Sequence, residues 1–261
     1  MNSATQGNLQ GQGALVTGAF TGLGLHIARV LMNAGARVAL AGRRIELSHE
    51  QGDRLTAETG AQATAVYMDV TQPQTVQSAF ATASASAWLG DPPQVVVNNA
   101  GVAHTAPALE LAPEQWNALI ATNLSGCFFV AQAKAQALVA AERPGSIVNI
   151  ASILGLRVTQ QVPAYAAAKA ALVHLTKALS LGWARHGIRV NALALGYIET
   201  DLNQDFFASD AGRALVKRIP QRRLGRADEL SAPLLLLAFS ALSYMTGAVI
   251  AVDGGHLVNT L

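Results

Sequence analysis

The sequence has 261 residues, of which 51% are hydrophobic and 13% are charged, enough apolar material for one large core. Its 18 basic and 16 acidic residues are well mixed and give a formal net charge of +2, too small to indicate binding to nucleic acid or to an anionic membrane. The single cysteine, Cys127, excludes an internal disulfide and gives no reason to expect a metal site, so a reducing, cytoplasmic location is expected.

No linker, charge run or repeat divides the chain, so we expect one domain over residues 1–261, with a flexible terminus over 1–10. The N-terminal segment MNSATQGNLQGQ is polar, and no signal peptide is expected. The longest apolar run, APLLLLAFSAL from Ala232, is too short to span a bilayer and contains Pro233. We therefore expect no membrane span.

Short β-branched segments alternate with longer helical patterns along the chain. Strands are expected at 13–18, 36–42, 65–70, 94–101, 145–152, 188–195 and 247–255. Helices are expected at 22–34, in the polar segment that follows the second strand and ends at about residue 59, and in a segment that begins near residue 73. Two more are expected over 113–140 and over the segment that contains YAAAK. This alternation predicts an α/β fold with parallel strands and helical crossovers. The strands are apolar almost throughout, which indicates that helices cover both faces of the sheet.

The segment TGAFTGLG (17–24) follows the first expected strand and begins the first helix. Gly18, Gly22 and Gly24 form the pattern TGxxxGxG, which allows a tight turn and a close approach of the backbone to a pyrophosphate at the helix N-terminus. The spacing differs from the GxGxxG of the general dinucleotide fingerprint. A plain strand–helix connection would also explain the glycines, so both interpretations stay open.

The segment YAAAK places Tyr165 and Lys169 four residues apart, on the same face of a helix. A phenol is a poor acid–base catalyst at neutral pH, but a nearby ammonium favours the phenolate. Two unit charges about 4 Å apart interact by roughly 4 kcal/mol at an effective dielectric constant of about 20. The pair therefore predicts a proton-transferring tyrosine, although YxxxK alone is usually structural.

The motifs together resemble the short-chain dehydrogenase/reductase family. They are TGxxxGxG, NNAG at 98–101, and Ser152 thirteen residues before the tyrosine of YxxxK. The resemblance extends from about Gly13 to Gly255. It implies a single-domain Rossmann-type, doubly wound parallel sheet of about seven strands, a bound NAD(H) or NADP(H), and a homotetramer or homodimer.

The resemblance implies four catalytic residues: Asn123, Ser152, Tyr165 and Lys169. Ser152 would donate a hydrogen bond to the substrate oxygen, where negative charge develops as hydride arrives. Lys169 would bind the nicotinamide ribose, and Asn123 would hold a water near Lys169. Taken singly, Ser152 and Asn123 could be ordinary structural residues.

The resemblance also implies a set of coenzyme contacts. They are Gly18, Thr21, Gly22, Leu23, Gly24, Arg43, Arg44, Asp69, Val70, Asn99, Ala100, Gly101, Tyr165, Lys169, Gly196, Ile198 and Thr200. In NAD-selective members an acidic residue ends the second strand, whereas here Gly42 is followed by Arg43 and Arg44. Because arginine can bind a 2′-phosphate, NADP(H) is favoured, and NAD(H) remains an alternative. The two arginines could instead belong to a solvated loop.

Several of these positions have a structural alternative. Asp69 could cap the next helical segment rather than contact adenine, and Asn98 and Asn99 could only hold backbone groups. Leu195 stands where the family usually has proline, so the turn at Gly196 is expected to be looser. The closing DGG (253–255) is expected to be structural.

Substrate contacts are expected from three loops, with His104, Leu156, Gln161 and Tyr197 as the first candidates. Further candidates are Arg157, Val162, Phe206 and Phe207. His104 could be a solvated histidine, and Arg157 could bind a carboxylate or lie on the surface. The mixture suits a polyol, a keto sugar acid or a small ketone.

Two other functions stay open. A 3-oxoacyl-acyl-carrier-protein reductase would need a basic docking patch. Candidates for that patch are Lys217, Arg218, Arg222 and Arg223. A non-catalytic coenzyme-binding regulator could use the same fold.

Self-association is expected from the helices that begin near Pro113 and Tyr165, because they carry more apolar surface than one sheet face can bury. The residues concerned are Cys127, Phe128, Phe129, Leu172, Leu175 and Leu179. Such helices could form an isologous interface, or they could pack within one chain.

Overall fold

Strand β1 (Gly13–Thr17) lies in the middle of a parallel sheet, between β2 (Arg37–Gly42) and β4 (Val95–Asn98). The other strands are β3 (Ala63–Tyr67), β5 (Gly145–Ser152), β6 (Ile188–Leu195) and β7 (Val249–Val252). Their order is β3-β2-β1-β4-β5-β6-β7, and the prediction of a doubly wound sheet of about seven strands is confirmed. The winding reverses between β1 and β4, where sheets of this kind bind ligands beyond the carboxyl ends of the strands.

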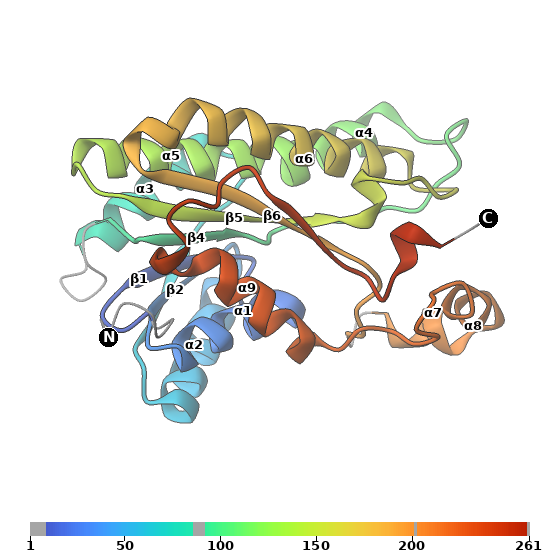
Figure 1. Ribbon diagram of the computed structural model, residues 1–261, viewed down its shortest axis with the longest axis horizontal. Coiled ribbons are helices and arrows are strands. Elements are labelled where there is room, and N and C mark those ends of the chain that lie inside the picture. The colour runs from blue at the N-terminus through green and yellow to red at the C-terminus, as the bar shows by residue number, and fades with distance from the viewer. Residues whose placement is uncertain (1–8, 86–91, 201–202, 260–261) are drawn as a thin grey trace.

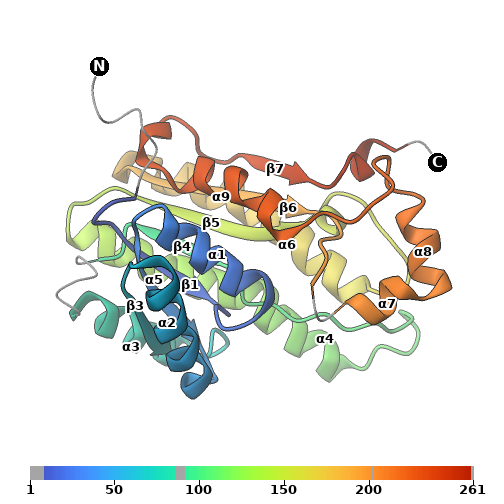
Figure 2. The same cartoon turned by 90° about the horizontal axis from the view of Figure 1, so that it is seen from below.

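The computed structural model describes residues 9–85, 92–200 and 203–259. Helices α1 (Gly22–Asn33), α2 (Ile45–Thr59) and α9 (Ser231–Ala238) cover one face of the sheet. Helices α3 (Pro73–Ala85), α4 (Pro113–Ile120), α5 (Gly126–Ala140) and α6 (Pro163–Trp183) form the layer on the other face (Figure 1). The short helices α7 (Gln204–Ala208) and α8 (Asp210–Val216) lie at one end of the molecule, near the last helical turn of the chain (Figure 2).

Apolar side chains of β1 point alternately to the two faces of the sheet. Ala14 and Val16 pack in the cluster that includes residues of α1 and α9, whereas Leu15 packs with Val76 of α3 and Val130 of α5. All five side chains are buried. The continuous apolar pattern of the strands thus reflects two helical layers, as the sequence predicted.

The third strand begins and ends earlier than expected. It spans Ala63–Tyr67 rather than residues 65–70. Met68 and Val70 are buried in the connection after β3 and so resemble strand residues in the sequence. Asp69 therefore lies in this connection, two residues after the end of β3.

The helix expected over 113–140 is divided by a π-helical turn, Ala121–Ser125, between α4 and α5. The N–H of Gly126 donates to the carbonyl of Ala121, five residues earlier. Asn123 lies in this turn and is completely buried. The helical segment thus has the expected bounds, and the π-helical turn within it was not predicted.

Two predictions about surfaces need correction. Leu9 was expected in a flexible terminus but is buried, and its N–H donates to Ala34 O at 2.8 Å; residues 1–8 lie outside the described residues. Cys127 and Leu172, expected to contribute to self-association, are buried within the chain. Among the helices that the structure describes, none is long and apolar enough to cross a membrane.

Candidate active site

A cavity of about 770 Å³ opens beyond the carboxyl ends of the strands. Every predicted coenzyme contact lines it: Gly18, Thr21, Gly22, Leu23, Gly24, Arg43, Arg44, Asp69, Val70, Asn99, Ala100, Gly101, Tyr165, Lys169, Gly196, Ile198 and Thr200. Ser152 and Tyr197 also line it. These residues come from the ends of six strands and from α1 and α6. The fold therefore brings the separate sequence motifs into one site.

The turn between β1 and α1 has the backbone that its glycines suggest. Gly18 and Gly22 have positive φ angles of 64° and 52°. A Cβ on Gly24 would lie 2.1 Å from Gly18 O, so only glycine permits this close packing. The first turn of α1 reads GLGL without an acidic residue, and within the described part of the chain the Thr21 side chain makes no capping bond to it. The first N–H groups of α1 can therefore bind a phosphate.

Thr17, the threonine of TGxxxGxG, joins this turn to NNAG. Its hydroxyl accepts hydrogen bonds from the N–H groups of Asn99 and Ala100, each at 3.0 Å. The Asn99 amide donates to Thr17 O at 3.0 Å and Gly18 O at 3.3 Å. Asn99 therefore fixes the phosphate turn and lines the cavity at the same time. The spacing of the motifs alone could not reveal that Thr17 connects them.

Asn98 has a separate structural role on the other side of the β4 end. Its amide donates to Cys127 O at 3.1 Å and to Asn149 Oδ1 at 2.9 Å. Asn149 in turn donates to Thr176 Oγ1 at 2.9 Å. This buried chain ties β4, β5, α5 and α6 together, so the structural interpretation of Asn98 is supported.

Asp69 organises a turn at the cavity rather than capping α3, which begins at Pro73. Its Oδ1 accepts hydrogen bonds from the N–H of Thr71 at 3.0 Å and from the Thr71 hydroxyl at 2.8 Å. These bonds shape the turn that leads into α3, and both residues line the cavity. A side chain that organises a turn can thus also form part of the coenzyme wall.

Lys169 is held firmly beside Tyr165 on α6. Its ammonium donates to Ile150 O at 2.7 Å and lies 5.6 Å from the centre of the Tyr165 ring. Ser152 ends β5 in the same cavity, and its hydroxyl accepts a hydrogen bond from Leu154 N at 3.1 Å. Because that bond uses an oxygen lone pair, the Ser152 O–H can donate to another group. The three residues thus provide two proton-bearing oxygens and one fixed cation.

Asn123 lies beside this site rather than in its wall. Its Oδ1 accepts from Val102 N and its amide donates to Val102 O, both at 2.8 Å. A Cβ on Gly101 would lie 3.4 Å from Asn123 Oδ1. The side chain therefore holds the loop after NNAG, and the structure does not place it with Ser152, Tyr165 and Lys169 in the cavity lining.

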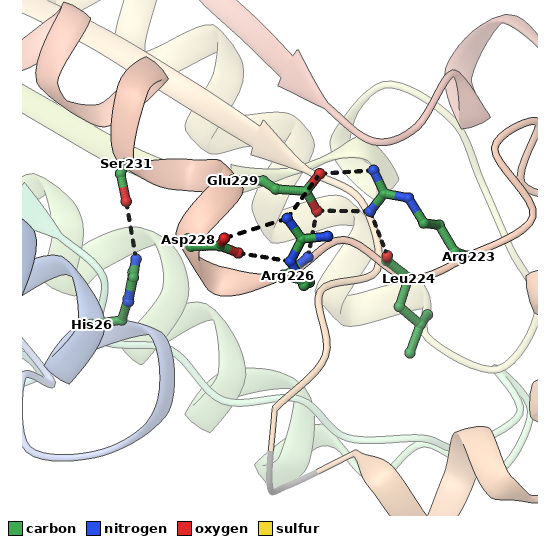
Figure 3. Close-up of polar contacts among 7 residues, drawn as sticks. All are labelled: His26, Arg223, Leu224, Arg226, Asp228, Glu229 and Ser231. Carbon is green, nitrogen blue, oxygen red and sulfur yellow. Dashed lines mark hydrogen bonds and ion pairs between the residues drawn. The ribbon is translucent and has the colours of Figure 1, made fainter.

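The segment after β6 is held by a neighbouring strand-like segment. Ile198 forms a parallel bridge with Gly225, whose N–H donates to Tyr197 O at 2.9 Å. Glu229 accepts two hydrogen bonds from Arg223, each at 2.7 Å, and one from Arg226 N at 2.8 Å (Figure 3). These bonds lower the Glu229 pKa to about 2, and the bonds from Arg223 have the largest effect. The Arg223–Glu229 bonds thus join the two ends of the loop that contains Gly225, the residue that pairs with Ile198.

The comparisons with known proteins agree with this arrangement. A family model described as enoyl-(acyl carrier protein) reductase matches residues 18–256. The chain is 38% identical to galactitol 2-dehydrogenase (L-tagatose-forming) of Cereibacter sphaeroides, over 99% of this chain and 100% of that protein. It is 36% identical to gluconate 5-dehydrogenase of Gluconobacter oxydans (strain 621H), over 97% of each.

A solved structure extends the similarity to the fold. The gluconate 5-dehydrogenase from Burkholderia cenocepacia J2315, in complex with NADP and tartrate, is 36% identical with a TM-score of 0.93. The alignment covers 99% of this chain and 100% of that one. The chain belongs to the short-chain dehydrogenase/reductase family. It is a nicotinamide-dependent oxidoreductase of the kind that acts on CH–OH groups.

The nicotinamide coenzyme of short-chain dehydrogenases fits the residues present. The phosphate turn offers a close backbone approach, because Gly18 and Gly22 have the backbone that only glycine adopts easily and Gly24 leaves no room for a Cβ. Arg43 and Arg44 supply positive charge at the same cavity. The chain's own geometry therefore supports a dinucleotide that carries phosphates.

The substrate loops of this short-chain dehydrogenase agree only partly with the sequence prediction. Of the four first candidates Tyr197 lines the cavity, whereas among the described residues His104, Leu156 and Gln161 lie outside its lining. Val102 and Ala103 line it instead and were not predicted. Loop side chains have no regular spacing, so the sequence could not show which of them face inward.

Tyr197 belongs to an aromatic and basic group next to the cavity. Its ring lies 5.8 Å from the Phe207 ring and 5.6 Å from the His256 ring, centre to centre. Arg157 donates to the carbonyl of His256, which fixes the arginine near these rings. Burial raises the Tyr197 pKa. The positive charge of Arg157 acts to lower this pKa, and the neighbouring Tyr165 acts to raise it further. Tyr197 therefore lies within electrostatic reach of both Tyr165 and Arg157.

Proposed function

We propose that this short-chain dehydrogenase interconverts a secondary alcohol and its ketone, with NADP(H) as the preferred coenzyme and a polyol or a sugar acid as the substrate. One observation supports the chemistry above the others: Ser152, Tyr165 and Lys169 line the same cavity as the glycine-rich phosphate turn. A proton donor, a second hydrogen-bond donor and a coenzyme site thus face one space.

In the direction of ketone reduction, the Tyr165 hydroxyl donates its proton to the carbonyl oxygen. The Ser152 hydroxyl donates a hydrogen bond to the same oxygen and stabilises the charge that develops there. The nicotinamide, when bound, supplies the hydride or, in alcohol oxidation, accepts it. The hydrogen bond to Ile150 O holds the Lys169 ammonium in place near the Tyr165 ring. In alcohol oxidation the Tyr165 oxygen takes the proton instead.

Positive charge at the end of β2 supports the preference for NADP(H). Arg43 and Arg44 line the cavity directly after Gly42, where an acidic residue would favour NAD(H). A guanidinium can bind a phosphate through two charge-assisted hydrogen bonds. The similar gluconate 5-dehydrogenase that was solved with NADP is consistent with this assignment.

The substrate class is supported by two relatives whose names specify galactitol and gluconate. The alternative, an acyl-carrier-protein ketoester reductase, has less support from the structure. Of its expected docking patch, Arg223 is bonded to Glu229 through both terminal nitrogens. An intact set of Ser152, Tyr165 and Lys169 also argues against a purely regulatory coenzyme-binding protein.

Coenzyme turnover with a panel of substrates tests the proposal. The panel contains galactitol, D-gluconate, the corresponding ketones and a 3-oxoacyl thioester, each with NADP(H) and with NAD(H). We expect turnover with at least one polyol or sugar acid and higher kcat/KM with the phosphorylated coenzyme. Turnover of the thioester alone would contradict the substrate class, and binding of coenzyme without turnover of any of these compounds would favour a regulatory role.

A further inference from the structure

The Phe20 ring lies directly over the α-carbon of Gly42. Phe20 belongs to the phosphate turn after β1, and Gly42 ends β2. A Cβ on Gly42 would lie 1.9 Å from Phe20 Cε1 and 2.7 Å from Cδ1. Gly42 is part of an extended strand, so it is the ring, rather than an unusual backbone angle, that leaves no room for a side chain. With the Phe20 ring in this position there is no room for an acidic side chain at position 42.

The other contact of the ring is with Arg44. The Arg44 guanidinium carbon lies 4.5 Å from the centre of the Phe20 ring, within the range of a cation–π contact. The backbone of Arg44 is also fixed, because its carbonyl accepts hydrogen bonds from the N–H and the hydroxyl of Ser48, both at 3.0 Å. An exposed arginine is thus held at both ends, with its charge at the cavity edge.

We propose that Phe20 determines the coenzyme selectivity of this site for a 2′-phosphorylated adenosine. It does so in two ways: its ring prevents an acidic side chain at position 42, and it holds the Arg44 guanidinium in place for the phosphate. The inference rests on the proposed preference for NADP(H), and it assigns that preference to a residue of the glycine-rich turn as well as to the arginines.

Binding of two adenosine fragments to the full chain tests the role of the ring without any turnover. The dissociation constants of 2′,5′-ADP and 5′-AMP are measured by calorimetry, and their ratio isolates the 2′-phosphate. Changes that affect the whole turn alter both ligands and cancel in this ratio. For the wild type we expect tighter binding of 2′,5′-ADP.

Two substitutions separate the effect of the aromatic face from that of an apolar side chain. Phe20→Leu keeps an apolar side chain but removes the aromatic face, and we expect the preference for 2′,5′-ADP to fall about two- to fivefold, the size of an exposed cation–π contact. Phe20→Tyr keeps the face and should keep the preference. An unchanged ratio in Phe20→Leu, or an equal loss in both variants, would overturn the inference.

Arg44→Ala shows whether Phe20 acts through the arginine. In that background Phe20→Leu should change the ratio no further, because the stacked cation is already absent. If the two effects simply add, Phe20 does not work by holding Arg44. Should Phe20→Leu fail to fold, as judged by circular dichroism, Arg44→Lys gives the same test, since lysine keeps the charge but loses the planar stack.

The exclusion at position 42 is tested with NADH binding. Gly42→Asp alone should gain little affinity for NADH, whereas Phe20→Ala with Gly42→Asp should gain more than the two single changes predict. Additive effects would refute the exclusion. A wild type that shows no preference for 2′,5′-ADP would instead contradict the proposed NADP(H) preference itself, so the two failures can be told apart.

Discussion

The ammonium of Lys169 lies 5.6 Å from the centre of the Tyr165 ring, one helical turn away on α6, and donates to Ile150 O at 2.7 Å. Only 4% of Lys169 is exposed, so the cation is held in one place by β5. The YAAAK segment thus places a phenol at the cavity and a fixed ammonium beside it.

Replacing Lys169 by methionine should remove most of the activity. Methionine keeps much of the length and the apolar packing but has neither the charge nor the bond to Ile150 O. We expect kcat/KM to fall at least about a hundredfold, in the range of lost acid–base assistance. Steady-state kinetics measure the change. The matched control is Lys177→Met on the exposed side of the same helix, which should retain activity; equal losses in both variants would contradict the role of Lys169.

The sheet and the site were largely predictable, because they follow from periodic patterns. Seven apolar segments alternating with helical ones indicate parallel strands, and the glycine turn and YxxxK have fixed spacings. What the sequence could not show depends on contacts between distant segments. Thr17 bonds to NNAG about 80 residues away, and Phe20 covers Gly42; neither relation has a local pattern.

The π-helical turn at Asn123 illustrates the same limit within one helix. An extra residue in a turn leaves the composition of the helix unchanged, so residues 113–140 look like one continuous helix in the sequence. The buried bonds of Asn123 to Val102 become visible only when the loop after NNAG is placed. The resemblance to the family implied a catalytic role for Asn123 but could not give its contacts with Val102.

Gly24→Ala should abolish coenzyme binding and destabilise the fold. The added Cβ would lie 2.1 Å from Gly18 O and 2.6 Å from Asn99 Nδ2, so the phosphate turn has to open. Calorimetric titration with NADPH and a thermal melt measure the two effects. Gly182→Ala in α6 is the control, because its Cβ would meet nothing within 4 Å. The alanine should add up to about 1 kcal/mol to the stability of the helix, so the melting temperature should stay equal or rise. Normal NADPH binding by Gly24→Ala would contradict the account of the turn.

Asn123→Ala should loosen the loop that contains Gly101 and Val102. Loss of two hydrogen bonds to the Val102 backbone is expected to cost about 1–3 kcal/mol in the free energy of unfolding. Urea denaturation measures it. Asn117→Ala, on the exposed surface of α4, should change stability by no more than about 0.5 kcal/mol. Equal stability of the two variants would show that the loop does not depend on Asn123.

Glu229 should stabilise the protein only above its lowered pKa. Its ordinary pKa of 4.5 falls to about 2 in the folded chain, because Arg223 and Arg226 N bond to the carboxylate. The ionised group therefore contributes its full stabilisation above about pH 4.5, and the contribution is lost as the pH falls toward 2. The melting temperature of Glu229→Gln should lie below that of the wild type at pH 7, and the gap should narrow between pH 4.5 and 2.

The control for this pH effect is Asp228→Asn, which removes the neighbouring exposed pair with Arg226. An exposed surface pair contributes little, so this variant should melt close to the wild type. A gap between Glu229→Gln and the wild type that is constant from pH 7 to pH 2 would contradict the assignment.

Turnover and coenzyme binding of Tyr165→Phe test the central claim most directly. The substitution removes one oxygen and leaves the ring beside Lys169. We expect kcat to fall at least about a hundredfold while the dissociation constant of NADPH, measured by fluorescence titration, stays within about twofold. Tyr244→Phe, at a fully exposed position, should behave as the wild type in both measurements. Near-normal turnover by Tyr165→Phe would show that this tyrosine is not the proton donor.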